Sequence, residues 1–313
     1  MNKKSDLISV IMSVYNEKEE YLKQTIESIK SQTYKNIEFI IIIDDPENVK
    51  MCQFIEKITK NDKRITVSYN EKNIGLTASL NRAIGLAHGK YVARMDSDDI
   101  SEVNRLEKQI EYLKKYKLDL VGSEMRHISS TNEIISELTN KSYSPKCLSK
   151  CLKYGNLIAH PTWLLKKEVY ISLNGYREMP ACEDYDFLLR AIHKGYKIGI
   201  CDQILLNYRI NENGISRKNL LKQQVASNYL STHYNHIEAI SVDKVKKNTE
   251  RLCTEKSKTN YNKAVYYFEY AYQNTKNKFI FITYLIKALF ASRFMCRRLY
   301  NILRIQIYKN LSS

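Results

Sequence analysis

The first hundred residues repeat one arrangement, in which a short strand-like run is followed by an amphipathic helical stretch. Four runs have the length and the β-branched content of strands, namely 7–14, 37–43, 64–69 and 90–95. Apolar residues recur at helical intervals in the stretches 19–32, 51–58 and 76–87. Strands that are apolar on both faces indicate a parallel sheet covered by helices on both sides, with right-handed crossovers. The sequence therefore predicts an α/β fold with a mostly parallel, doubly wound, Rossmann-like sheet.

The alternation continues to about residue 210 and then stops. Further helices are predicted at 105–116 and 183–193, and further strands at 118–125, 197–201 and 204–210. From about residue 218 the pattern is helical and Tyr-rich, without another strand that ends in acids. We therefore expect an α/β domain over residues 1–215 and a helical, basic C-terminal region over residues 216–313.

Polar and acidic residues follow three of the predicted strands. They lie at 15–17, at Asp44 and Asp45, and at 96–99. In an open α/β sheet, ligands bind beyond the carboxyl ends of the strands, so we expect these three loops to face one crevice.

The last of these loops carries Asp96, Asp98 and Asp99, whose mutual repulsion requires a cation or a basic partner. Mg²⁺ and Mn²⁺ favour one or two carboxylates together with phosphate oxygens and water, which such a loop supplies. The alternative is an acidic helix start, in which Asp98 or Asp99 caps the helix that follows. The residues alone leave both interpretations open.

Taken together, the motifs resemble glycosyltransferase family 2, the inverting enzymes of GT-A fold, of the kind that builds bacterial surface polysaccharides. The matching pieces run in the family's order across roughly residues 7–210, and they are Val14-Tyr15-Asn16-Glu17, Ile43-Asp44-Asp45, Asn73-Ile74-Gly75-Leu76, Leu80-Asn81, the run Gly89–Asp99, His160-Pro161-Thr162, Gly175-Tyr176 and Glu183-Asp184-Tyr185-Asp186. Each piece is short, and the order of all of them together carries the resemblance.

The resemblance implies a binding site for a nucleotide-sugar donor, most simply a UDP-sugar. Asp98, supported by Asp96, would hold Mn²⁺ or Mg²⁺ against the diphosphate, and the metal would stabilise the departing nucleoside diphosphate. The other donor-site positions that the resemblance assigns are Asp45 with Asp44 at the uracil ring, Tyr15 and Glu17 beside the base and ribose, and Asn73. Arg94 is either a phosphate contact in this site or an internal ion-pair partner of the acids that follow it.

Inversion at the anomeric carbon requires a base that deprotonates the acceptor hydroxyl as it attacks. Asp184 matches the base position of the family, and Glu183 is the neighbour most easily mistaken for it. Without the family pattern, both acids would be read as charges that stabilise the start of a helix.

Several positions depart from the family pattern or have an ordinary structural explanation. Pro46 follows Asp45 where the family usually shows Gly-Ser, and Asn211 stands where members often carry a histidine. Trp163, the single tryptophan, either stacks on an acceptor sugar or belongs to the core, and His160 is expected to be a packed residue.

Charge separates the two parts of the chain. Lys and Arg total 50 against 34 Asp and Glu, a formal charge of +16, and residues 271–313 contain no acid. Read as a single helix, this tail is basic and amphipathic, too interrupted to span a membrane but suited to an anionic membrane surface. The alternatives for the tail are an oligomer contact or packing against the main domain.

Seven scattered cysteines without a CxxC pair, and an N-terminus without a secretory pattern, predict reduced thiols and a cytoplasmic protein at the inner face of the plasma membrane. We expect the acceptor to be a lipid-linked or surface-glycan intermediate such as one of capsule or lipopolysaccharide. The rivals are a nucleotidyltransferase, although the first loop lacks the usual glycines, and a non-enzymatic protein that binds nucleic acid or membrane. An acidic crevice argues against nucleic acid.

Overall fold

The structure is a computed structural model that describes residues 5–138, 143–210 and 219–311. The chain divides into two compact units. The α/β unit comprises residues 1–149, 157–176 and 194–211, and the helical unit comprises residues 150–156, 177–193 and 212–313. The predicted boundary near residue 215 lies outside the described residues. The units interleave in sequence, because the predicted helix at 183–193 belongs to the helical unit.

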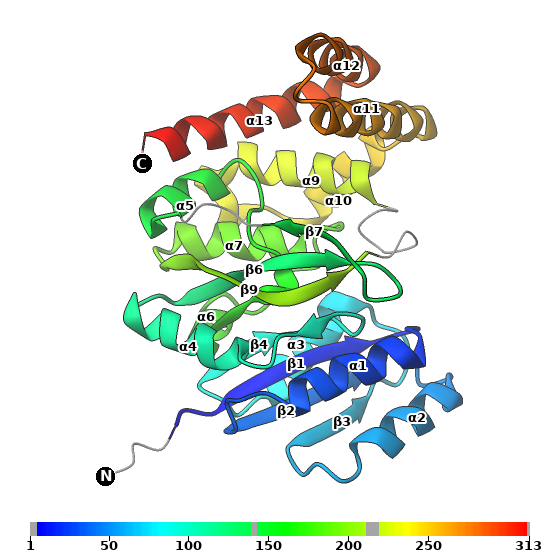
Figure 1. Cartoon of the computed structure of the whole chain (residues 1–313), viewed down its shortest axis with the longest axis vertical. Helices are drawn as coiled ribbons and strands as arrows, with labels where there is room; N and C mark the ends of the chain where they lie inside the picture. The colour runs from blue at the N-terminus through cyan, green and yellow to red at the C-terminus, as the bar shows by residue number, and fades with distance from the viewer. Residues whose placement is uncertain (1–4, 139–142, 211–218, 312–313) are drawn as a thin grey trace. The chain divides into compact units, whose positions relative to one another are not determined.

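The α/β unit is built on one sheet in the order β3-β2-β1-β4-β8-β6-β9-β5, with β7 paired to β6 (Figure 1). Its strands are β1 (Ile8–Val14), β2 (Ile37–Ile43), β3 (Ile65–Tyr69), β4 (Tyr91–Arg94), β5 (Ile100–Ser101), β6 (Leu120–Ile128), β7 (Ile134–Leu138), β8 (Leu164–Lys166) and β9 (Ile198–Arg209). The β3-β2-β1-β4 half is parallel throughout. Beyond β4 the sheet is mixed, because β8 pairs antiparallel with both β4 and β6 while β6 and β9 are parallel.

The two strands expected at 197–201 and 204–210 form one strand, β9. Its pairing with β6 shifts register around Glu124, where the regular alternation of the strand is interrupted. A local irregularity of this kind, with exposed Asp202 and Gln203 in the strand, makes one strand look like two in the sequence.

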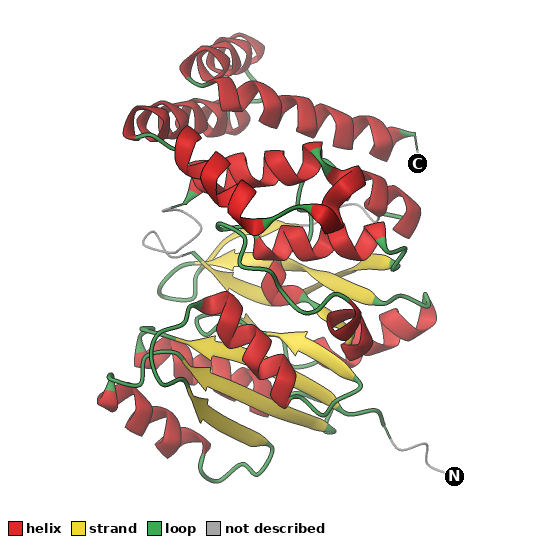
Figure 2. Ribbon diagram, turned by 180° about the vertical axis from the view of Figure 1, so that it is seen from behind, coloured by secondary structure: helices red, strands yellow, loops and turns green. Residues whose placement is uncertain are grey.

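Helices cover both faces of this sheet, as its apolar strands require. They are α1 (Glu19–Lys30), α2 (Val49–Thr59), α3 (Leu76–Leu86), α4 (Arg105–Lys115) and α6 (Lys167–Ser172). Figures 1 and 2 show α1 and α3 on opposite faces of the sheet. Leu22 and Ile26 of α1 and Leu80 of α3 are fully buried, in line with their helical spacing. This two-sided burial explains the continuous apolar runs of β1 and β2.

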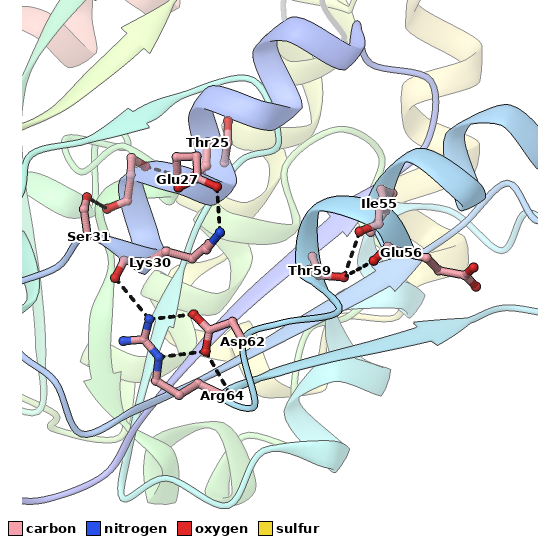
Figure 3. A network of polar contacts seen from close by, with 10 residues as sticks. Thr25, Glu27, Lys30, Ser31, Ile55, Glu56, Thr59, Asp62 and Arg64 are labelled. Atoms are coloured by element: carbon pink, nitrogen blue, oxygen red, sulfur yellow. Dashed lines mark hydrogen bonds and ion pairs between the residues drawn. The ribbon is translucent and has the colours of Figure 1, made fainter.

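The carboxyl end of α1 is fixed by a polar cluster at the start of β3 (Figure 3). Arg64 donates to both carboxylate oxygens of Asp62, from Nε at 2.9 Å and from Nη2 at 2.6 Å. The same Nη2 donates to the Lys30 carbonyl at 3.1 Å. The last carbonyls of a helix have no partner within the helix, so this contact satisfies one of them and anchors α1 beside β3.

The helical unit contains α7 (Glu183–His193), α9 (Leu220–Thr232), α10 (Val242–Leu252), α11 (Glu255–Gln273), α12 (Lys278–Ala291) and α13 (Arg293–Asn310). The short helix α5 (Pro145–Leu152) begins in the α/β unit and ends in this one. A small core forms around Leu221, Val225, Tyr261 and Met295. Among the described residues, no helix is both long and apolar enough to span a membrane.

The tail is not the single amphipathic helix that the sequence suggested. Ser292 is extended, with φ −152° and ψ 128°, and it ends α12 and caps α13 through its hydroxyl. The helical phase is lost there, so the basic residues do not share one face. Arg298 and Arg304 point back into the unit, where they donate to Tyr261 and Tyr154.

Candidate functional site

The three loops that carry the predicted donor-site residues meet at one edge of the sheet. β1 pairs in parallel with β2 and with β4, so the carboxyl ends of all three strands lie together. Tyr15 follows β1, Asp44 and Asp45 follow β2, and Asp96 follows β4 by one residue. The ring of Tyr15 is 51% exposed, and its amide donates to Glu17 Oε2 at 2.9 Å. This edge offers an exposed aromatic face beside a group of carboxylates.

Asp44 organises the neighbouring loop with its own carboxylate. It is buried, and it accepts hydrogen bonds from Asn70 Nδ2 at 2.6 Å, from the Ile74 amide at 2.9 Å and from the Gly75 amide at 2.9 Å. With three protein donors, Asp44 is engaged in shaping the loop at the start of α3.

Two other predicted donor-site residues lie beside this loop and remain accessible. Asp45 is partly exposed, and its carboxylate makes no hydrogen bond or ion pair within the described residues. Asn73 is exposed and accepts from the Gly75 amide at 3.0 Å. Asp45 is therefore the carboxylate of the β2 loop that can accept a hydrogen bond from a ligand.

Arg94 is the buried cation of the site. Its guanidinium is 3% exposed and forms an ion pair with Asp96, so the structure places it in the internal pairing that the sequence left open. Its Nε and Nη1 find no partner among the described residues. Arg94 neutralises one charge of the acidic loop and holds Asp96 at the edge of the sheet.

The carboxylates at this edge raise one another's pKa. Burial, with the negative charges of Asp96 and Glu17 nearby, raises the pKa of Asp98 to about 7. Burial also raises the pKa of Glu17, and Asp96 adds to the effect. A raised carboxyl pKa means that the ionised form is destabilised there. Burial is the larger cause of both shifts, and the neighbouring carboxylates add to it.

Asp99 contacts the fold through one carboxylate oxygen and its backbone carbonyl. It is fully buried, and its pKa is raised well above the ordinary value by burial and by the charges of Asp96 and Asp98. Its Oδ1 accepts from the Arg209 amide at 2.9 Å, and its carbonyl accepts from Thr25 Oγ1 at 2.6 Å. The helix-capping alternative for Asp98 and Asp99 is wrong, because α4 begins at Arg105, six residues after Asp99, and its N-cap is Asn104.

Arg209 supports the acidic loop from behind, which sequence reasoning missed. Its Nε donates to the Asp98 carbonyl at 2.8 Å, its Nη2 donates to Gln24 Oε1 at 2.8 Å, and its guanidinium lies 4.1 Å from the centre of the Tyr21 ring. In the sequence, Arg209 is a single arginine between a tyrosine and an isoleucine at a strand end. The residues around it do not indicate which loop its side chain contacts. The neighbouring Asn211 lies outside the described residues.

The acids of the β4 loop would supply only part of a metal site. Among the described residues, no three His, Cys, Asp or Glu side chains come together as a metal site. Mg²⁺ and Mn²⁺ retain water and phosphate oxygens as ligands, so one or two carboxylates suffice for them. Asp98 is destabilised as an anion, and Asp96 has one oxygen engaged by Arg94. These two residues fit a divalent cation that arrives with a diphosphate.

The predicted base lies in the helical unit, at the start of α7. Asp184 Oδ2 accepts from Asn156 Nδ2 at 2.7 Å, and Oδ1 accepts from the Tyr185 amide at 2.6 Å. Asp184 and Glu183 are both partly exposed. They belong to the first turn of α7, where backbone amides favour negative charge.

Asp186, two residues further on, is a buried structural anchor. Arg177 contacts both of its carboxylate oxygens, and Arg190 Nε donates to it at 2.8 Å. Arg177 also donates to the Ile237 and Ile240 carbonyls, at 3.1 and 2.8 Å. This pairing fixes the helix that presents Asp184, and no motif in the sequence indicates the partners of Asp186.

The His-Pro-Thr and Gly-Tyr motifs form a buried network in the α/β unit. His160 Nε2 lies 2.7 Å from Tyr176 Oη, which lies 2.6 Å from Tyr170 Oη. Burial lowers the pKa of His160 well below its usual range, so the imidazole is neutral. Asn81 makes two hydrogen bonds to the backbone of Tyr176. Its Oδ1 accepts from the Tyr176 amide at 2.8 Å, and its Nδ2 donates to the Tyr176 carbonyl at 2.9 Å. Trp163 is fully buried, so the core alternative holds for it.

An α/β unit with acids and an exposed aromatic ring at the carboxyl edge of its parallel strands is the arrangement of a nucleotide-binding enzyme. The sequence profile described as Glycosyl transferase family 2 matches residues 9–173. The chain belongs to glycosyl transferase family 2. This membership favours a glycosyltransferase over the nucleotidyltransferase and over the non-enzymatic alternatives.

Relatives and solved structures agree with this assignment. An uncharacterized glycosyltransferase of Methanocaldococcus jannaschii is 39% identical over 73% of this chain and 79% of its own length. The O-antigen biosynthesis glycosyltransferase WbnJ of Escherichia coli is 33% identical over 75% of this chain and 97% of its own. The crystal structure of S. aureus TarS 1-349 in complex with UDP-GlcNAc covers 97% of this chain and 90% of that one, with a TM-score of 0.58 and 17% identity. The last similarity supports the GT-A fold.

Proposed function

We propose that this protein transfers a sugar from a UDP-sugar donor to a hydroxyl group of a surface-glycan or lipid-linked glycan acceptor, with inversion at the anomeric carbon. The proposal rests on the carboxyl edge of β1, β2 and β4. An exposed tyrosine ring, a carboxylate without a partner in the described part of the chain and the two acids of the β4 loop lie together there. Tyr15, Asp45 and Asp98 are the residues on which it rests.

The donor's nucleoside fits the β1 and β2 loops. The exposed Tyr15 ring supplies a face for stacking with the uracil base. Asp45 has a free carboxylate that can accept the imide N–H of uracil, a donor that cytosine lacks. Asp44 acts indirectly, because its carboxylate already holds the amides of the Asn73 loop. The contact with Asp45 therefore favours a uracil nucleotide over a cytosine nucleotide.

The donor's diphosphate would bind at the β4 loop, where Asp98 and Asp96 would hold a divalent cation. A bound Mn²⁺ or Mg²⁺ acts as a Lewis acid that stabilises the negative charge on the departing diphosphate. Asp98 would supply the principal ligand and Asp96 the second, while the ion pair with Arg94 holds Asp96 in place. Arg94 itself is buried against Asp96 and does not need to contact the donor.

Asp184 is the proposed general base. Asn156 Nδ2 and the Tyr185 amide each donate to one oxygen of its carboxylate, which orients the group. As the base, Asp184 would accept the proton of the acceptor hydroxyl as that oxygen attacks the anomeric carbon. Glu183, one residue earlier on the helix, projects in a different direction and cannot share the task.

The acceptor class follows from the relatives. WbnJ is named for O-antigen biosynthesis and AmsE of Erwinia amylovora, 27% identical over 70% of this chain, for amylovoran biosynthesis. We propose a related setting, with the enzyme working at the cytoplasmic face of the plasma membrane, where lipid-linked acceptors are exposed.

The direct test is a panel of nucleotide sugars incubated with the full chain and Mn²⁺ or Mg²⁺, with release of the nucleoside diphosphate as the readout. We expect release from a UDP-sugar, faster with an added glycan acceptor and abolished by a chelator. Asp45→Ala should lower the preference for UDP over CDP, because it removes the acceptor for the imide N–H of uracil. Release that is equal for all nucleotides, or unchanged by chelation, would contradict the assigned donor site.

A further inference from the structure

Helix α12 exposes large apolar side chains to solvent along its outer side. Phe279 and Phe290, near its two ends, are 80% and 89% exposed, and Ile282, Ile286 and Leu289 between them are also exposed. Isolated exposed apolar residues are ordinary, whereas a contiguous set usually marks an interaction surface. We call these five residues the α12 stripe.

The spacing of the stripe places it on one face. At about 100° per residue, the five side chains fall within an arc of about 100°. Lys278 lies about 20° beyond one edge of that arc and Lys287 about 60° beyond the other. Both lysines are exposed. An apolar stripe bordered by lysines on both sides is typical of a helix that lies in the interface of a lipid bilayer.

The opposite face of α12 is already occupied, so the stripe is not a misplaced core face. Tyr284 packs between Tyr267 and Tyr270 of α11, with ring centres 5.8 and 4.4 Å apart, and Ala288 is fully buried. The stripe lies on the other side, so α12 is apolar on two opposite sides while only one of them is covered. A helix of that kind requires an apolar environment on its second side.

Cations and aromatic rings accompany the stripe. Lys287 Nζ lies 4.5 Å from the centre of the Tyr284 ring, and Lys276 is exposed just before α12. A groove of about 430 Å³ beside the stripe is lined by Asn260, Lys263, Tyr267, Ile286, Lys287, Phe290 and Ala291. Tyr rings and Lys side chains, which join an apolar body to a polar tip, favour the boundary between lipid and water.

We propose that the α12 stripe lies on the surface of an anionic lipid bilayer, parallel to it, with its phenylalanines between the acyl chains and its lysines at the headgroups. The 14 residues of α12 extend about 21 Å, shorter than the ~30 Å hydrocarbon core, so the helix lies on the bilayer and does not cross it. Residues 271–313 contain no acid, which matches a negative surface. The inference deepens the proposed function, because it brings the enzyme to a lipid-linked acceptor.

The test is cosedimentation of the full chain with vesicles of equal parts phosphatidylglycerol and phosphatidylcholine, compared with phosphatidylcholine alone. We expect binding to the anionic vesicles that weakens with salt. The double substitution Phe279→Ser and Phe290→Ser should weaken it at least tenfold, because two phenylalanines lose their insertion. Replacing Lys276 and Lys278 by Gln should weaken it by about tenfold or more.

Matched controls separate the stripe from general surface effects. Val49→Ser with Ile171→Ser removes two exposed apolar side chains of the α/β unit, and Lys60→Gln with Lys63→Gln removes two exposed charges there. Both control pairs should bind vesicles like the wild type.

Vesicle binding uses neither donor nor acceptor, so it stands or falls independently of sugar transfer. The proposal is overturned if the wild type stays in the supernatant or if the controls lose as much binding as the stripe variants. It is equally overturned if light scattering shows a wild-type dimer that the phenylalanine variant dissociates, without vesicle binding. In that case a second copy of the chain covers the stripe.

Discussion

Asp98→Asn should make the α/β unit more stable at neutral pH while it removes the response to metal. In the folded protein, burial and the charges of Asp96 and Glu17 raise the pKa of Asp98 from 3.8 to about 7. The folded state therefore binds more protons than the unfolded chain between these two values, and stability falls as pH rises through that window. A shift of this size corresponds to about 4 kcal/mol in total, of which about 2 to 3 kcal/mol lies between about pH 5 and about pH 8.

The assay is urea unfolding without metal, followed by fluorescence. Trp163 is the single tryptophan and is fully buried in the α/β unit, so its emission reports the unfolding of that unit. The free energy of unfolding of the wild type should fall from about pH 5 to about pH 8, relative to Asp98→Asn, by the amount given above. Taking the difference between the two proteins removes the titration of every other group. The control is Glu111→Gln on α4, whose carboxylate is 64% exposed.

Metal and donor provide the second half of the test. Mn²⁺ with UDP should stabilise the wild type more at the higher pH, because the cation binds the ionised carboxylate and must displace its proton at the lower pH. Asp98→Asn should lose most of this stabilisation. If the wild type and Asp98→Asn show parallel pH profiles, or if Mn²⁺ with UDP stabilises both equally, then Asp98 is not the charged ligand that we infer.

Three further outcomes test other parts of the molecule. Asp184→Asn should lower turnover by about a hundred- to ten-thousandfold while UDP binding, measured by calorimetry, stays nearly unchanged; unchanged turnover would remove Asp184 from the base role. Tyr15→Ala should weaken UDP binding by roughly tenfold through the loss of stacking. Equal affinity would show that the uracil ring does not stack on Tyr15. Gly175→Ala should destabilise the α/β unit by about 2 kcal/mol or more, because φ there is +66° and the added Cβ would lie 2.4 Å from Asn81 Oδ1; wild-type stability in urea would contradict this.

The sequence was a good guide to the elements and to the edge where the site lies. The strand at 37–43 and the helix at 183–193 have the bounds that the apolar pattern predicted, since long periodic runs are set by local burial. The order of motifs placed Tyr15, Asp45 and Asp98 at one edge, because parallel strands bring their carboxyl ends together. The strands β5, β7 and β8 were missed. They are two to five residues long, too short for a periodic signal.

In the tail, breaks between helices make a prediction from the periodicity of the whole segment wrong. Summing residues 271–313 as one helix gave a basic face, but a single extended residue, Ser292, resets the phase between α12 and α13. Arg298 and Arg304 then bind inside the helical unit, while the apolar stripe of α12 stays outside. The proposed attraction to an anionic surface therefore rests on α12 and the lysines beside its stripe.

The roles of individual acids could not be predicted, because they depend on partners that are distant in sequence. Asp44 and Asp45 are adjacent and chemically identical, yet the amides of the Asn73 loop occupy the first and leave the second free. Asp98 and Asp99 differ in the same way, because Arg209, 110 residues after Asp99, binds its carboxylate through the backbone. In both pairs, hydrogen bonds within the protein engage the carboxylate of one acid, and the carboxylate of the other can bind a ligand. An adjacent pair of acids at a strand end therefore indicates a site, and only the contacts of each carboxylate show which member can bind.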